Sequence, residues 1–150
     1  MAAPVKKIIT VVAVIHAPVE KVWISWTDPK YIIRWNNASE DWHTPRAEND
    51  LRAGGRFISR MESKDGKTGF DFSGRYGKVE EYKLIEYTLD DGRKVKVTFV
   101  SHRLGTVVTE EFEAEGENTV EAQKEGWQAI LDNFKKFVES PESLLITDSI

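Results

Sequence analysis

The sequence predicts an α+β fold in which a curved antiparallel sheet of about six strands surrounds a long C-terminal helix. Three observations carry this prediction. A continuous β-branched stretch at residues 7–15 indicates a first strand. Alternating apolar and polar segments, separated by turn signals such as Asp65-Gly66, fill residues 54–114 and indicate strands joined by hairpins. The period then becomes helical over 120–138, and this helix can cover one face of the sheet.

The segment between the first strand and the alternating run predicts two short helices. Pro18 follows the strand, and proline fits the first turn of a helix. Apolar residues recur at helical spacing over 19–26, and Pro29 begins a second helical turn over 29–33. Residues 36–53 are polar and irregular, so we expect a long loop there, a kind of segment that is often functional.

Side chains two apart along a strand share a face, and this parity predicts which ones face the helix. The inward sets are Phe57, Ser59 and Met61; Phe70, Phe72 and Tyr76; Val95, Val97 and Phe99; and Val108, Glu110 and Phe112. Ser59 then needs a hydrogen-bond partner or a ligand, unless it lies at a solvated bend. Desolvation would raise the pKa of Glu110 and suit it to act as an acid or base. The alternative is a twisted or bulged strand that leaves Glu110 solvated or paired with Arg60 or Arg75.

Composition excludes several classes of protein. Lys and Arg total 21 against 25 Asp and Glu, and the net charge of -4 argues against nucleic-acid binding. The absence of cysteine excludes disulfides, thiolate nucleophiles and Cys-ligated metals. The longest apolar stretch, residues 8–15, is too short to span a membrane, and the N-terminus lacks the apolar core of a signal peptide. We therefore expect a cytoplasmic protein.

Catalytic and metal-binding motifs are missing from the sequence. No His-x-x-x-His or His-x-Glu pattern occurs, so we expect neither a metal site nor a cofactor. No serine stands in a Gly-x-Ser-x-Gly context. In the long loop, Trp42 could stack on a flat ligand and His43 could perform acid–base work, although an exposed loop with a packed Trp explains both more simply.

Short motifs spread along the chain resemble those of a known family. They are Ala17-Pro18-x-x-x-Val22-Trp23, Trp35 after the second helix, Gly54-Gly55-x-Phe57, Gly74-x-Tyr76-x-x-Val79, and Gly126-Trp127-x-x-x-Leu131. Their order is similar to that in the bacterial branch of the family named after the activator of the heat-shock-protein-90 ATPase. That family belongs to the START/polyketide-cyclase (SRPBCC, birch-pollen-allergen-like) superfamily. The resemblance covers residues 6–140 and implies a helix-grip fold with a deep apolar cavity between sheet and helix.

The resemblance also implies a function, since members of the superfamily bind lipids, polyketides or flavonoid-like molecules. We expect the cavity to hold a small hydrophobic or aromatic ligand. The candidate site residues are Trp35, Trp42, Phe57, Phe70, Phe72, Tyr76, Phe99, Trp127 and Leu131, with Glu110 as a polar anchor. Two alternatives stay open. One is a co-chaperone that stimulates a heat-shock-protein-90 ATPase, and the other is a cyclase or dehydratase that uses Glu110, His43 and Tyr76.

The length of 150 residues predicts a single domain. Residues 140–150 form a tail that is either frayed or docked on another surface. Its apolar segment Leu144-Leu145-Ile146 would suit a homodimer contact.

Overall fold

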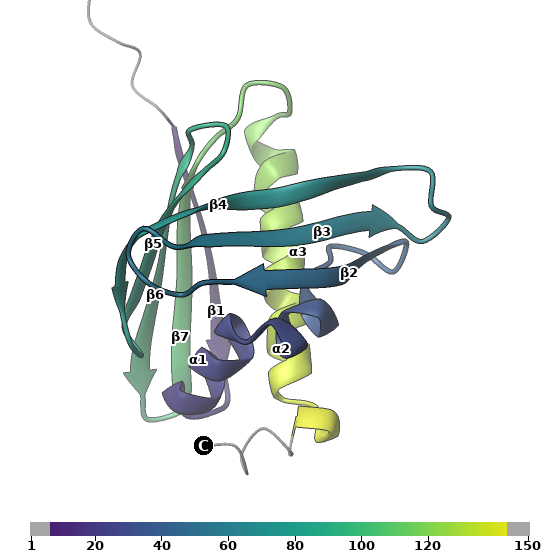
Figure 1. The fold of residues 1–150 in the computed structure, drawn as a ribbon. Helices are drawn as coiled ribbons and strands as arrows, with labels where there is room; N and C mark the ends of the chain where they lie inside the picture. Colours follow the sequence, from purple (N-terminus) through teal and green to yellow (C-terminus); the bar gives the residue numbers. More distant parts are fainter. Residues whose placement is uncertain (1–6, 144–150) are drawn as a thin grey trace, which may run out of the picture.

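A computed structural model of the chain describes residues 7–143, so the expectations for Leu144-Leu145-Ile146 lie outside the described residues. The elements in chain order are β1 (Ile8–Ile15), α1 (Val19–Thr27), α2 (Pro29–Trp35), β2 (Trp42–Asn49), β3 (Arg56–Ser63), β4 (Gly69–Glu80), β5 (Leu84–Leu89), β6 (Lys94–His102), β7 (Gly105–Glu113), α3 (Val120–Val138) and the 3-10 turn η1 (Pro141–Ser143). The predicted α+β class is confirmed, because one sheet curls around the long helix α3 (Figure 1).

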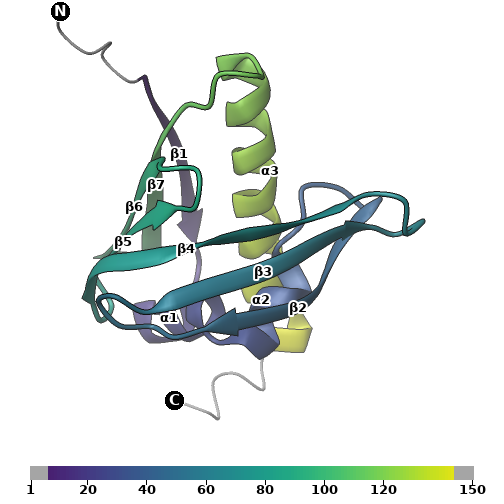
Figure 2. The same ribbon diagram turned by 45° about the horizontal axis from the view of Figure 1, so that its top comes forward.

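The strands form one antiparallel sheet in the order β1-β7-β6-β5-β4-β3-β2. From β2 to β7, each strand pairs with the next one along the chain. The first strand instead pairs with the last, with Ile9 opposite Phe112. Helices α1 and α2 carry the chain from the β1 edge to the β2 edge. Figure 2 shows β2, β3 and β4 passing across α3, so the sheet wraps the helix from two sides.

The region 36–53, predicted to be a loop, contains the strand β2. It pairs with β3 at the edge of the sheet, with an irregular register between His43 and Arg46. Pro45 stands in that irregular part, as expected for proline on an edge strand. The strand alternates weakly, because Thr44 is its one fully buried side chain. An edge strand held by backbone pairing needs no apolar face, so its polar sequence resembles a loop. The sheet therefore has seven strands rather than about six.

Burial confirms the predicted alternation along β3, β5, β6 and β7, whereas on β4 Tyr76 is buried, Phe72 is half-buried and Phe70, which was expected to face inward, is exposed. Along β7, every second residue is buried from Thr106 to Phe112. The stripe of α3 is fully buried at Leu131, Phe134 and Val138. These side chains meet α1, α2 and the concave face of the sheet, so the densest part of the core lies around the C-terminal half of α3.

Local hydrogen bonds fix where α3 begins and how it lies on the sheet. The Thr119 side chain caps the helix by accepting a hydrogen bond from the backbone N–H of Ala122 at 3.1 Å. Two long side chains of α3 then reach the free edge of β1. Gln128 Nε2 donates to the carbonyl of Val12 at 3.1 Å, and Lys135 Nζ donates to that of Val14 at 2.6 Å. These contacts protect an edge that would otherwise expose unpaired carbonyls. Of the helices in residues 7–143, none is long and apolar enough to cross a membrane.

Candidate functional site

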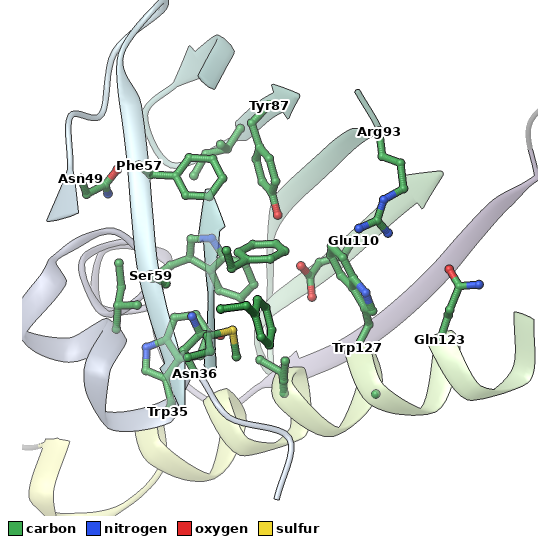
Figure 3. A pocket seen from close by; sticks show the side chains of 18 of the residues that line it. Trp35, Asn36, Asn49, Phe57, Ser59, Tyr87, Arg93, Glu110, Gln123 and Trp127 are labelled. Atoms are coloured by element: carbon green, nitrogen blue, oxygen red, sulfur yellow. The ribbon is translucent and has the colours of Figure 1, made fainter. Parts of the chain in front are cut away.

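A cavity of about 420 Å³ lies between the concave face of the sheet and the N-terminal half of α3 (Figure 3). Its wall combines side chains from α1, α2, five strands and α3 with Glu115 and Asn118 from the β7–α3 loop. Helix α3 contributes two small residues to this wall, Ala122 and Gly126. Larger side chains at these positions would fill the space. Cavities of about 300–1,000 Å³ are typical of small-molecule sites.

Aromatic rings make up much of the wall, and they hold one another in place. Trp127 stacks on Phe112 with centroids 3.8 Å apart and planes at 12°. The same indole makes an edge-type contact with Phe72, with centroids 6.0 Å apart. Across the cavity, Phe57 contacts Tyr76 at 5.2 Å and Tyr87 at 4.9 Å. Because each ring is braced by a neighbour, the walls are pre-formed rather than free to collapse into the space.

Most of the side chains proposed from the sequence are brought together here. Seven of the ten line the cavity: Trp35, Phe57, Phe70, Phe72, Tyr76, Glu110 and Trp127. Phe70 is 47% exposed and stands at the mouth, whereas Phe57 and Tyr76 are buried in the wall.

The other three lie elsewhere. Phe99 is buried in the core, with its ring 5.1 Å from that of Trp23. Leu131 is fully buried in the core and does not line the cavity, although its neighbour Ile130 does. Trp42 lies on the edge strand β2, with its ring 6.0 Å from that of Phe70, and does not line the cavity. Strand parity selected the correct face for Phe99 but does not say how far along the strand the cavity extends.

The three acid–base candidates of the cyclase reading are not brought together. His43 is exposed on β2 outside the cavity, with Nε2 4.0 Å from Glu62 Oε1. The Tyr76 hydroxyl donates to Asn49 Oδ1 at 2.6 Å, and burial raises the pKa of this phenol. Of these three candidates, only Glu110 lines the cavity without a hydrogen bond or ion pair to another side chain.

Glu110 is 5% exposed and faces the cavity from β7. The strand pairs in unbroken register with both neighbours, so no bulge turns this side chain outward. The bases considered as partners are engaged elsewhere: Arg60 pairs with Glu62 at 2.9 Å, and Arg75 donates to the Gly54 carbonyl at 2.6 Å. Desolvation therefore acts on an unpaired carboxyl and raises its pKa to about 8.

Two buried hydroxyls, those of Ser59 and Tyr87, also belong to the cavity wall. Ser59 is 6% exposed within β3, opposite Phe72, and so does not lie at a solvated bend. Tyr87 is 9% exposed, and burial followed by the nearby Glu110 charge raises its pKa well above the usual range. Across residues 7–143, every fully enclosed side-chain nitrogen or oxygen has a hydrogen-bond partner. The Glu110, Ser59 and Tyr87 groups make no such bond, so they remain reachable from the cavity.

Sequence reasoning missed several lining residues. The main ones are Trp26, Ile32, Asn36, Glu48, Asn49, Ile85, Tyr87, Arg93, Gln123 and Ile130. Tyr87 had a readable signal, because it alternates with Ile85 and Leu89 on β5 and all three are buried. Glu48 and Asn49 had none, since they belong to the strand β2 that resembled a loop. Within the described range, no cluster of three or more His, Cys, Asp or Glu is arranged to hold a metal ion.

Comparison with known proteins shows which family and which solved structures the chain is similar to. The family model described as activator of Hsp90 ATPase homolog 1-like protein matches residues 16–139. An Aeromonas hydrophila protein of that description, solved by NMR, is 47% identical over 91% of this chain and 95% of its own, with a TM-score of 0.86. A protein from Cytophaga hutchinsonii is 46% identical over 89% of this chain and 92% of its own, with a TM-score of 0.75. A Chromobacterium violaceum protein at 24% identity, covering 89% of this chain and 99% of its own, shares the fold with a TM-score of 0.80. No curated protein shows significant similarity to the chain.

Proposed function

We propose that this chain, which belongs to the activator of Hsp90 ATPase homolog 1-like family within the SRPBCC superfamily, binds a small hydrophobic or aromatic molecule. The binding site is the cavity between the sheet and α3. The observation that carries this proposal is the cavity itself. A space of about 420 Å³ stays open beside a tightly packed core, and its walls are aromatic rings braced by one another. Rings offer large apolar area at small entropic cost, so such a space favours flat or apolar molecules.

A thermal-shift screen of flavonoids, aromatic polyketides, sterols and lipids tests this proposal. A ligand at 100 times its Kd stabilises the folded state by about 2.7 kcal/mol. For a chain of this size, that shift amounts to several degrees in Tm. The proposal predicts at least one chemical class with a clear shift.

The matched variant is Gly126→Leu. Gly126 lies within α3 and lines the cavity, and a Cβ added there meets no atom within 4 Å. Leucine should therefore fill the space without strain, and it also favours the helix over glycine. We expect the variant to fold normally and to lose the ligand-induced shift. The control Lys124→Leu adds the same side chain to an exposed position of α3 and should keep it. Equal shifts in wild type and Gly126→Leu would show that ligands bind elsewhere.

A second candidate function comes from the description of the matched family, which names an activator of the Hsp90 ATPase. Under this reading the chain would bind a heat-shock-protein-90 chaperone and raise its rate of ATP hydrolysis. A pull-down with the chaperone, followed by an ATPase assay, measures this directly. Gly126→Leu separates the two candidates, because filling an internal cavity should leave a surface-mediated stimulation unchanged.

A further inference from the structure

Glu110 is the one carboxyl that is buried in the wall of the cavity, and it stands among aromatic rings. Figure 3 shows its carboxyl and the Tyr87 hydroxyl directed into the same space, beside Trp127. The strand neighbours of Glu110 are apolar, since Val11 on β1 and Val97 on β6 lie opposite it. Within residues 7–143, no Lys, Arg or His nitrogen lies at ion-pair distance from this carboxyl. The cavity thus holds a buried acid to which residues 7–143 supply no basic partner.

The remaining charged groups of the wall reinforce this imbalance. Glu48 on β2 and Glu115 in the β7–α3 loop also line the cavity. The one basic side chain of the wall is Arg93, and its Nε donates to Asp91 Oδ2 at 2.8 Å. Of the three carboxyl groups of the wall, Glu48 is exposed and Glu115 accepts a hydrogen bond from the Asn118 N–H, so Glu110 is the buried one that neither Arg93 nor a backbone N–H neutralises. A fatty acid or another anionic ligand would add a further negative charge to this space.

We infer that the molecule bound in this cavity is an aromatic or hydrophobic amine, whose ammonium group lies beside Glu110 and against the faces of the surrounding rings. This inference rests on the proposed function and names its ligand class. A buried carboxylate is strongly destabilising unless it is paired, and an ammonium group supplies the missing partner. Aromatic faces attract the same cation through their quadrupoles, which is how aromatic cages recognise substituted ammonium ions. The Tyr87 hydroxyl, which is directed into the same space, can donate to the carboxylate that forms.

Binding should be coupled to a proton. In the empty cavity Glu110 keeps its proton at pH 7, because burial raises its pKa to about 8. An ammonium ion favours the carboxylate, so binding at pH 7 should release a proton to solvent. Affinity for a permanently charged ammonium ion should then rise with pH and level off above about 8. Tyr87 and Tyr76 stay neutral over this range, since burial raises the pKa of both phenols.

Two isosteric probes test the inference. Phenethyltrimethylammonium carries a permanent charge, and (3,3-dimethylbutyl)benzene has the same shape without it. Tryptophan fluorescence or calorimetry at pH 8.5 should show the cation binding about tenfold more tightly. In Glu110→Gln this preference should disappear, whereas the control Glu111→Gln, on the exposed face of the same strand, should retain it. Calorimetry at pH 7 in buffers of different ionisation enthalpy should show proton release for the cation alone.

The outcomes separate the inference from the function on which it rests. If the neutral isostere binds as tightly as the cation, or if Glu110→Gln keeps the preference, the ammonium assignment is wrong while cavity binding stands. If neither probe nor any compound of the wider screen binds, both proposals fall together. A melting curve of Glu110→Gln confirms that the variant is folded before affinities are compared.

Discussion

The space between the sheet and α3 has two ends that use the same residue types in opposite ways. At the end covered by α1 and α2, rings pack directly on one another: Phe134 lies 4.9 Å from Trp26 and 4.8 Å from Trp35. At the other end, rings surround a cavity of about 420 Å³. Figure 1 shows α1 and α2 beside the C-terminal half of α3, while β3 and β4 cross its N-terminal half. Aromatic content alone therefore does not distinguish a core from a binding site.

The helix α3 accounts for much of this difference. Where the core is packed, α3 presents Leu131, Phe134 and Val138, all fully buried. Where the cavity opens, Gln123, Trp127 and Ile130 also line it, but α3 presents the small residues Ala122 and Gly126, four residues apart on one face. Small side chains on the helix, opposite large rings on the sheet, leave space that the sheet cannot close. The packed end supplies stability, and the open end is free to bind.

The largest expected effect is the pH dependence caused by Glu110 at the open end. Its pKa is about 8 in the folded chain against 4.5 ordinarily. Between these values the unfolded chain loses the proton while the folded chain keeps it, so stability is full below pH 4.5 and falls as the pH rises through 8. Glu110→Gln removes this loss, and should be more stable than wild type by up to about 5 kcal/mol at pH 9.

Urea unfolding of both proteins at pH 5, 7 and 9 measures this difference. At pH 5 the two should be close in stability, because a protonated carboxyl and an amide have similar polarity. The exposed neighbour variant Glu111→Gln should follow wild type at every pH. A constant difference between Glu110→Gln and wild type across this range would show that Glu110 is ionised in the folded protein.

Truncation of one ring at each end gives the next largest effect. Phe134→Ala removes a fully buried ring from the packed end, and should destabilise the protein by about 3–5 kcal/mol. Phe72→Ala shortens a half-buried ring that already borders open space, so its effect should be about 1–2 kcal/mol. Denaturant midpoints compare the two directly. Equal losses would mean that the cavity wall is packed as tightly as the core.

The smallest effect is a gain in stability at Gly126. Alanine there meets no atom within 4 Å and favours the helix by about 1 kcal/mol over glycine. Gly74→Ala is the contrasting change, because its Cβ would lie 2.4 Å from the Thr88 carbonyl oxygen. Thermal unfolding should show a higher Tm for Gly126→Ala and a lower Tm for Gly74→Ala. A lower Tm for both would indicate that the space beside Gly126 is filled.

The sequence predicted the fold and part of the cavity wall, for reasons visible in particular residues. Alternation along β7 placed Glu110 inward, and the unbroken register of that strand kept it there. The strand β2 escaped prediction, because an edge strand can be polar on both faces. Parity also assigned Phe99 to the inner face but could not separate the packed end from the open end. That separation depends on where α1 and α2 dock, which is a tertiary contact with no local signal.

The five tryptophans provide the most direct test of the account. Trp26, Trp35 and Trp127 line the cavity, whereas Trp23 and Trp42 lie outside its lining. In a heteronuclear NMR titration with a ligand found by screening, the indole N–H signals of the first three should shift. Trp26 and Trp127 should shift more than Trp35, because neither indole nitrogen has a hydrogen-bond partner in the described structure, whereas that of Trp35 donates to the Ser25 carbonyl at 2.9 Å. Shifts confined to Trp23 and Trp42, with the other three unchanged, would contradict binding in the cavity.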